Sequence, residues 1–380
     1  MRRVAVAGVG LTPVREHWES SHRDLFAEAA LKAFDEAGTD EIDALYVSSM
    51  GSAILQRQLH LGAMMADVLG KRGITALRVE AASASGGVAF HEGVKAVASG
   101  LNDCVLVGGV EKMSDVLPGE VTSSLAMSED QEYTAYTGVT KTGLSAIIHR
   151  HYMERFGVEA EEVAAFAVRG HEHAVGCPHA QYPFKISVER LLASPMEADP
   201  IHVLECSSIG DGAAAVLLRP AEAVEDGVEV ASTAVATGIY NLTGRPDILT
   251  FDSVRGAAAR ALDASGVSHG DIDVLEVHDD TTITGVISLE DLGFVEKGKG
   301  AAYVAEGSTA RGSELPTNTF GGLKARGNPL GATGLYQIVE VAMQIRGDAG
   351  PCQVDGAEVG LAQSAGGLGS TCAVTVLRRG

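Results

Sequence analysis

The sequence has few aromatic residues and few positive charges. The first shortage bears on how the chain packs, and the second on which partners it can bind. Aromatic side chains make up only 5% of the 380 residues, whereas Gly occurs 46 times, a combination that suits helices packed closely on sheets. Lys and Arg number 29 against 50 Asp and Glu, which gives a net charge of -21. A chain this acidic repels phosphate backbones, so we expect no nucleic-acid partner.

Cysteine is also scarce, and its spacing argues against cysteine-rich sites. The odd number of cysteines includes no CxxC pair: Cys104, Cys177, Cys206, Cys352 and Cys372. We therefore expect neither a disulfide framework nor a metal site. No apolar run approaches the length of a membrane span. The opening MRRVAVAGVG lacks a cleavage pattern and predicts a first strand, so the expected location is the cytoplasm.

The chain contains an internal repeat, which predicts two copies of one α/β unit. Residues 4–50 and 228–280 each predict a strand, an amphipathic helix, a turn and a second strand. The two helices have apolar residues at three-and-four spacing and end at Gly38 and Gly266, as expected for a helix C-terminus.

A second pair of helices extends the repeat and sets the domain prediction. Residues 87–100 and 334–347 agree in length and pattern, and an apolar strand follows each. We predict an N-terminal half over 1–222 and a C-terminal half over 223–380. The first half contains an inserted region, about 115–200, which is rich in His, Tyr and Met and is typical of a binding lid.

Small residues crowd the stretch VEAASASGGVAF, where Ser83 stands at the corner before a helix. This helix and the one that begins near Gly331 are expected to meet at the pseudo-twofold axis. Helix N-termini carry partial positive charge and unpaired N–H groups. A site built there has oxyanion donors before any side chain is counted.

Six motifs, which together are typical of one protein family, occur in order between residues 79 and 372. They are VEAASASGG (79–87), GGVEKMSD (108–115), CSSIGDGAAAV (206–216), VHDDTTIT (277–284), LPTNTFGGLKARGNPLGATGLYQIVE (315–340) and AQSAGGLGSTC (362–372). This series resembles the thiolase superfamily, closest to its archaeal and sterol-carrier-type members. The resemblance implies two βαβαβαββ halves in a five-layer αβαβα sandwich, assembled as a homodimer or a dimer of dimers.

The resemblance also implies an activity, because thiolases condense or cleave acyl-CoA thioesters without a further cofactor. They use a nucleophilic Cys, a His in an HDCF-like loop, a second His in GHPxGATG and an acid/base Cys. Here Ser83 stands at the nucleophile position, and His278 is retained. Asp280 stands where HDCF has Cys, and Asn328 stands where the second His is expected.

These departures change the chemistry that the motifs can support. A serine hydroxyl needs a positioned general base, whereas Asn328 cannot take a proton. His278 is therefore the remaining base in these motifs. Ser83, His278 and Asn328 also resemble the layout of priming ketosynthases, in which His and Asn donate to a thioester oxygen. In that interpretation Asp280 is a general acid/base.

Further site residues follow from the resemblance and from helix position. The family's tail loop supplies an oxyanion N–H, which corresponds to Gly367, or to Gly366 within one residue, and it pairs with the N–H of Ser83. Tyr336 lies on a helix face near the site and is a candidate substrate contact, with core packing as the alternative. Five histidines without metal-site spacing are interpreted as surface or lid residues: His149, His151, His171, His173 and His179.

Three functions stay open at this point. The first is a thiolase-like acyl-CoA acyltransferase, of the acetyl-CoA acetyltransferase or 3-ketoacyl-CoA thiolase type, with Ser83 as acyl carrier. The second is an inactive homologue that binds acyl-CoA or acts as a complex subunit. The third is a retro-aldol lyase on a CoA substrate, which needs a base, Asp280 or Tyr336, but no nucleophile. The resemblance also implies a small OB-fold partner protein with a zinc ribbon.

Overall fold

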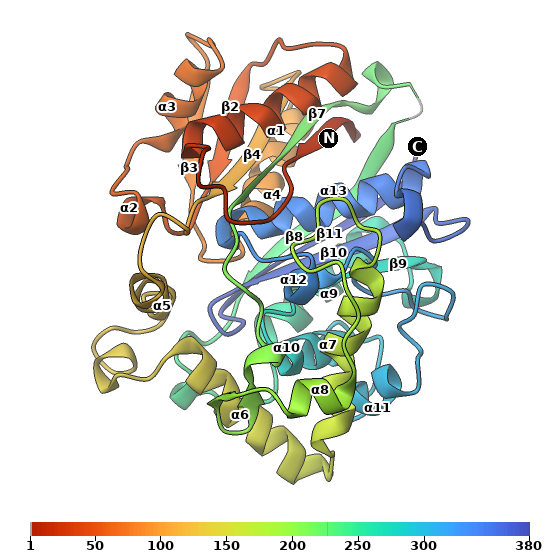
Figure 1. Ribbon diagram of the computed structural model, residues 1–380. Helices are drawn as coiled ribbons and strands as arrows, with labels where there is room; N and C mark the ends of the chain where they lie inside the picture. Colours follow the sequence, from red (N-terminus) through yellow and green to blue (C-terminus); the bar gives the residue numbers. More distant parts are fainter. Residues whose placement is uncertain (1, 226) are drawn as a thin grey trace.

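Nine strands form one sheet in the computed structural model, which describes residues 2–225 and 227–380 (Figure 1). The strand order is β3-β2-β4-β7-β1-β8-β11-β10-β9. The strands are β1 (Val4–Leu11), β2 (Ala44–Ser48), β3 (Thr75–Val79), β4 (Val105–Glu111), β7 (Gly212–Pro220), β8 (Val228–Thr237), β9 (Val274–Glu276), β10 (Val359–Gly366) and β11 (Thr371–Arg379). A separate antiparallel pair joins β5 (Met196–Ala198) and β6 (Ile201–His202).

The two halves of the chain share this sheet through a short seam. Ala5 and Val6 of β1 pair with Glu229 and Val228 of β8, and this antiparallel contact covers only these residues. On one side of the seam, β2 runs parallel to both β3 and β4. On the other side, β10 runs parallel to β9 and antiparallel to β11. Each half therefore contributes its own mixed set of strands.

Helices pack on both faces of the sheet, and two of them contact strands of both halves. The helices are α1 (His22–Ala37), α2 (Ser52–Leu55), α3 (Leu61–Val68), α4 (Ser85–Ser99), α5 (Pro118–Ala126), α6 (Lys141–Phe156), α7 (Ala160–Ala174), α8 (Val188–Leu192), α9 (Asp252–Ser265), α10 (Thr282–Asp291), α11 (Gly300–Ala305), α12 (Gly322–Ala325) and α13 (Thr333–Arg346). In the described part of the chain, no helix combines the length and the apolar character that a bilayer span requires.

The layering confirms the predicted fold class. Helices α4 and α13 contact strands of both halves, so they form a middle layer. Helices α1 and α3 cover the outer face of the first half, and α9 covers that of the second. The helix stops predicted at Gly38 and Gly266 are also confirmed, since these residues have φ of 64° and 68°, where glycine is favoured.

Glycines allow the two central helices to approach each other at their N-termini. A Cβ on Gly86 would lie 2.8 Å from the backbone nitrogen of Leu335. A Cβ on Gly334 would lie 2.5 Å from the backbone nitrogen of Gly87. Neither position has room for a side chain, because the nearest atoms belong to backbone that cannot rotate away. The predicted meeting of the two helix N-termini follows from this contact.

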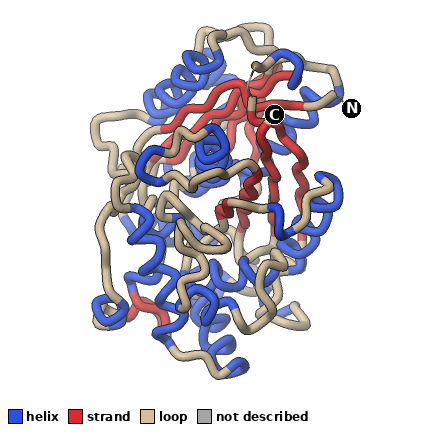
Figure 2. The backbone as a smooth tube through the Cα atoms, turned by 90° about the vertical axis from the view of Figure 1, so that its right-hand side faces the viewer, coloured by secondary structure: helices blue, strands red, loops and turns tan. Residues whose placement is uncertain are grey.

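The inserted region forms helices α5 to α8, which lie below the sheet in Figure 1. Figure 2 shows the same division, with the strands gathered in the upper part of the molecule and mostly helices and loops beneath. Helix α6 packs on α10, and α7 packs on α10, α11 and α12. The insertion is therefore a helical layer against the second half of the chain.

Of the two interpretations of the five histidines, as surface or as lid residues, the surface interpretation is wrong for four. His149, His171, His173 and His179 are buried, and His151 alone is exposed. The reason is that α6 and α7 are covered on their inner faces. The ring of His173, for example, lies 3.0 Å from the carbonyl oxygen of Thr317.

Candidate active site

Ser83 lies in a tight turn between β3 and α4, and its side chain is buried. The preceding Ala82 has φ of +50°, a left-handed conformation that non-glycine residues rarely adopt. The Ser85 hydroxyl stabilises this turn, since it accepts the Ala81 N–H at 2.8 Å and donates to the Ala82 carbonyl at 2.5 Å. Such strain is often found at functional sites.

The Ser83 hydroxyl has no base beside it. Its Oγ lies 3.8 Å from Met50 Sδ, and no imidazole or carboxylate of the described residues is within hydrogen-bond distance. Serine becomes a nucleophile when a positioned base takes its proton. In this geometry the hydroxyl is therefore not yet activated, although catalytic hydrogen bonds often form only when substrate binds.

His278 follows β9 and is buried with a free imidazole. Its backbone N–H donates to Gln363 Oε1 at 2.8 Å, which fixes the loop. Both ring nitrogens are buried and have no hydrogen-bond partner among the described residues. Burial lowers the pKa of His278 to about 4, although Asp280 acts in the opposite direction. The ring is therefore neutral at pH 7 and can both donate and accept.

Asp280 is held as a carboxylate by two partners. Its Oδ2 lies 2.5 Å from Lys141 Nζ, and its Oδ1 accepts a hydrogen bond from Thr284 Oγ1 at 2.7 Å. Burial acts to raise the pKa of Asp280, but Lys141 and the other partners outweigh it and lower the pKa to about 2. A group with this pKa carries no proton at neutral pH, so this ion-paired state does not suit a general acid.

Asn328 is oriented by two side chains. Its Nδ2 donates to Ser207 Oγ at 3.1 Å, and its Oδ1 accepts from Thr333 Oγ1 at 2.7 Å. Asn328 and Asp280 line the same cavity, which has a volume of about 70 Å³. The structure therefore brings these two predicted residues together.

The tail loop approaches the Ser83 turn closely. A Cβ on Gly366 would overlap the carbonyl oxygen of Ala81, so only glycine fits there. The next residue, Gly367, has φ of +61°. The predicted oxyanion donors, Gly366 or Gly367 and Ser83, thus belong to two segments in direct contact.

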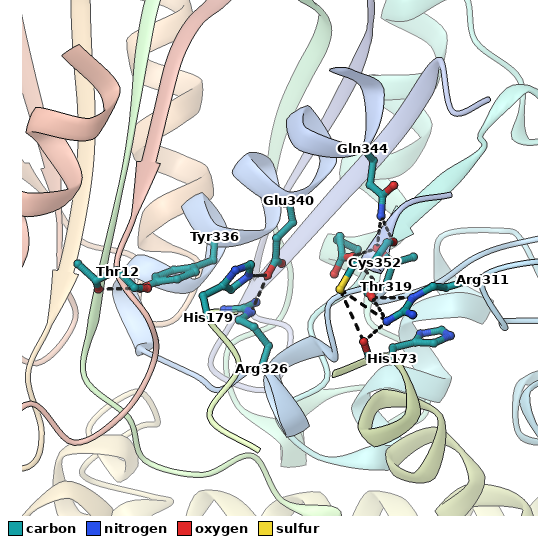
Figure 3. Close-up of polar contacts among 11 residues, drawn as sticks. Thr12, His173, His179, Arg311, Thr319, Arg326, Tyr336, Glu340, Gln344 and Cys352 are labelled. Atoms are coloured by element: carbon teal, nitrogen blue, oxygen red, sulfur yellow. Dashed lines mark hydrogen bonds and ion pairs between the residues drawn. The ribbon is translucent and has the colours of Figure 1, made fainter. Parts of the chain in front are cut away.

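Tyr336 lies in the core and not at the site, so its predicted contact with substrate is not supported. Its hydroxyl donates to the Thr12 carbonyl at 2.8 Å, and the ring is fully buried, with the Arg326 guanidinium 5.0 Å from the ring centre (Figure 3). Burial raises the pKa of the Tyr336 hydroxyl. The alternative of core packing describes this residue, because its polar group is already bonded to the chain's own backbone.

A buried ionic network is centred on Glu340, which lies one turn beyond Tyr336 on α13. Glu340 Oε1 lies 3.1 Å from Arg326 Nε and 2.9 Å from His179 Nε2, and all three side chains are buried (Figure 3). Arg326 also helps to restrain the pKa of Asp279, which burial raises to about 7. Because Asp279 adjoins His278, this network supports the loop that carries the imidazole.

Sequence reasoning missed Lys141 and Glu129, two residues of the inserted region. Lys141 is the first residue of α6 and pairs with Asp280. Glu129 is buried, and its Oε1 lies 3.5 Å from the position that a Cβ on Gly367 would take. The sequence contains one signal for Lys141. A lysine at a helix N-terminus is unfavourable with respect to the helix dipole, so its presence there indicates a nearby carboxylate. No motif marks either residue.

Comparisons with known proteins give matches over nearly the whole chain. The family model described as thiolase, N-terminal domain, matches residues 4–222, and that described as thiolase C-terminal domain-like matches residues 234–379. An acetyl-CoA acetyltransferase of Methanothermobacter thermautotrophicus is 45% identical over 385 residues, 100% of each chain. Sterol carrier protein 2 of Homo sapiens is 32% identical and covers 100% of this chain and 72% of its own length.

Solved structures share the fold at lower identity. A chain of the Ltp2-ChsH2(DUF35) aldolase aligns with a TM-score of 0.86 at 22% identity, over 99% of this chain and 98% of that one. The acetyl-CoA acetyltransferase of Syntrophomonas wolfei aligns with a TM-score of 0.77 at 20% identity, over 100% and 99% of the two chains. At these identities the likeness concerns the fold alone.

Proposed function

Because this chain belongs to the thiolase family of acyltransferases, we propose that it transfers acyl groups of coenzyme A thioesters, with Ser83 as the acyl carrier. The observation that carries the proposal is the placement of Ser83. A buried serine lies at the N-terminus of α4, on a turn with positive φ and directly against the Gly366 loop. The 45% identical acetyl-CoA acetyltransferase supports the same reaction class.

The proposed acyl transfer assigns one role to each group. Ser83 Oγ bonds to the acyl carbon while the bond from that carbon to the CoA sulfur breaks. The hydroxyl proton passes to the neutral imidazole of His278 and from there to the departing CoA thiolate. The N–H groups of Ser83 and Gly367 stabilise the oxyanion. Asn328 Nδ2 and the second ring nitrogen of His278 donate to the thioester oxygen in the substrate complex, before the attack. In the second step a nucleophilic group of the acceptor bonds to the acyl carbon and gives its proton to His278. The ester bond to Ser83 Oγ then breaks, and the proton passes from His278 to Oγ.

A retro-aldol lyase on a CoA substrate is the second candidate. One observation favours it: Ser83 Oγ contacts a thioether and not a base. Cleavage of a carbon–carbon bond through an enolate needs a base and oxyanion donors but no covalent nucleophile. In that reaction the free imidazole of His278 is the base, since Asp280 is engaged by Lys141.

Intact-mass measurement separates these functions. The full chain is incubated with acetyl-CoA and, separately, with acetoacetyl-CoA plus CoA, with Ser83→Ala as the control. An acetyl adduct that maps to Ser83 and is absent from the variant is the expected result. Turnover without an adduct, unchanged in Ser83→Ala, would favour the lyase. Binding of thioesters with neither adduct nor turnover would indicate an inactive homologue.

The proposed enzyme acts as a homodimer and binds a small partner protein. Strand β3 is an edge of the sheet, and Leu77 on it is 51% exposed. An open edge with an apolar side chain suits pairing with a second copy. The Ltp2-ChsH2(DUF35) aldolase has a second component in its name, which supports the proposal of a partner protein. We propose that this partner is a small OB-fold protein with a zinc ribbon.

A further inference from the structure

The cavity beside Asp280 and Asn328 is small, and one apolar cluster connects its wall with the residue that contacts Ser83. Leu330 lines it and belongs to the same apolar cluster as Met50, whose sulfur contacts Ser83 Oγ. Its volume is about 70 Å³. At about 10–15 Å³ for each water-sized group, this leaves room for roughly five groups. A short acyl chain attached at Ser83 or held as a thioester fits this space, whereas a long chain does not.

The lining of this cavity is mixed, because Leu125, Ile209 and Leu330 give it an apolar side. Its polar side comes from charged and hydroxyl groups, which an alkyl chain would have to cover. Lys141 and Asp280 form an ion pair in its wall, with side chains only 9% and 10% exposed. Thr142 and Ser207 add hydroxyl groups. Ser145, one turn along the same face of α6, also lines the cavity, and its hydroxyl is buried without a hydrogen-bond partner in the described part of the chain.

These groups distinguish three kinds of acyl chain. An alkyl chain would remove water from the ion pair and the hydroxyls and return no hydrogen bond, which is unfavourable. A carboxylate would place a second negative charge beside Asp280. A neutral hydroxyl can donate to Asp280 and accept from Lys141 or Thr142.

We propose that this cavity selects a short acyl chain that carries a hydroxyl group. The inference rests on the proposed function, because it takes the acyl group of a CoA thioester to lie beside Ser83. Lys141 and Thr142, both from the inserted region, then determine specificity. They recognise the chain beyond the thioester, while His278 and the oxyanion donors act on the thioester itself.

Calorimetric titration with three four-carbon thioesters tests the inference. The probes are 3-hydroxybutyryl-CoA, butyryl-CoA and succinyl-CoA, and the full Ser83→Ala chain is used because it cannot form an ester. We expect 3-hydroxybutyryl-CoA to bind about tenfold more tightly than each of the others, the effect of one good hydrogen bond. Thr142→Val should remove most of this preference. Thr122→Val, an exposed threonine on α5 with its hydroxyl bonded to the Pro118 carbonyl, should keep it.

A double variant supplies the converse test. Lys141→Leu with Asp280→Leu removes both charges together and makes the cavity apolar, so butyryl-CoA should become the tightest ligand. Equal affinity for all three thioesters in the Ser83→Ala chain would overturn the substrate class and leave the proposed function standing. The same holds if the preference survives in Thr142→Val. If none of the three thioesters binds, both proposals fail.

Discussion

At the scale of single residues, burial decides the charge of the groups around the site. His278 is neutral because water cannot reach its ring, whereas Asp280 stays ionised because Lys141 lies 2.5 Å away. Burial favours the neutral form of both residues, but only Asp280 has a cation in contact that outweighs it. Proton transfer at neutral pH therefore falls to the imidazole, which has both nitrogens free.

Burial of other histidines makes stability depend on pH, and His149 allows a clean test. Burial lowers its pKa to about 4, compared with about 6.5 when unfolded. Between these values the unfolded chain binds a proton that the folded chain does not, so acidification reduces stability. We expect His149→Phe to abolish a loss of about 2 kcal/mol between pH 7.5 and pH 5, measured by urea unfolding.

The matched control is His151→Phe, on the exposed side of the same helix. It removes an imidazole that water already reaches, so it should alter the pH dependence much less. For each variant, the free energy of unfolding at pH 5 is subtracted from that at pH 7.5. The subtraction cancels any effect of the substitution on packing, because packing contributes equally at both pH values. Equal changes in this difference for both variants would contradict the argument.

At the scale of elements, the contact between α4 and α13 holds the site together. Ser83 lies just before α4, and Asn328 lies just before the segment that leads into α13. The distance between the two helices depends on glycines that contact the backbone of the opposite helix. A larger residue at such a glycine would therefore displace both Ser83 and Asn328. We expect Gly86→Ala to lower the free energy of unfolding by about 3 kcal/mol or more, because the added Cβ meets the Leu335 nitrogen at 2.8 Å.

Gly119→Ala provides the control for this substitution. Gly119 lies in α5, and a Cβ there would have nothing within 4 Å. Alanine favours helix over glycine, so this variant should be more stable by up to about 1 kcal/mol. Urea unfolding of the two variants should therefore give changes of opposite sign, and a neutral Gly86→Ala would show that the helices can separate without cost.

The elements were predictable from sequence to the extent that their signals are local. Helix stops at Gly38 and Gly266 and the apolar strand patterns depend on neighbouring residues, and the structure agrees with them. The orientation of Tyr336 and the pairing of Lys141 with Asp280 depend on contacts between distant parts of the chain. Local patterns do not show such contacts. The lysine was therefore missed, and the sequence left open whether the tyrosine contacts substrate or packs in the core.

At the scale of the whole molecule, the open edge at β3 bears on assembly. Leu77 is 51% exposed on that strand, and the next residue, Arg78, donates to the carbonyl oxygens of Ser49 and Met50 near the site. Pairing through this edge would therefore also support the segment that contacts Ser83. We expect the chain to be dimeric in light scattering after gel filtration and Leu77→Asp to be largely monomeric, since charges on an edge strand oppose pairing.

Leu31→Asp is the comparison for this experiment, because Leu31 is similarly exposed, at 54%, but lies on α1. It should leave the dimer intact. A monomeric parent chain, or a dimer that persists in Leu77→Asp, would place the assembly surface elsewhere or remove it.

The seam between the halves also brings the two ends of the chain close together. Glu229 of β8 pairs with Ala5 on one side and with Arg378 on the other. The first and last strands are thus two strand spacings apart, about 10 Å, and both ends lie in the upper part of Figure 1. A linker of a few residues, at roughly 3.3–3.6 Å each, would close the polypeptide into a ring. The molecule is in this sense suited to circular permutation, with new termini opened in an exposed loop far from Ser83.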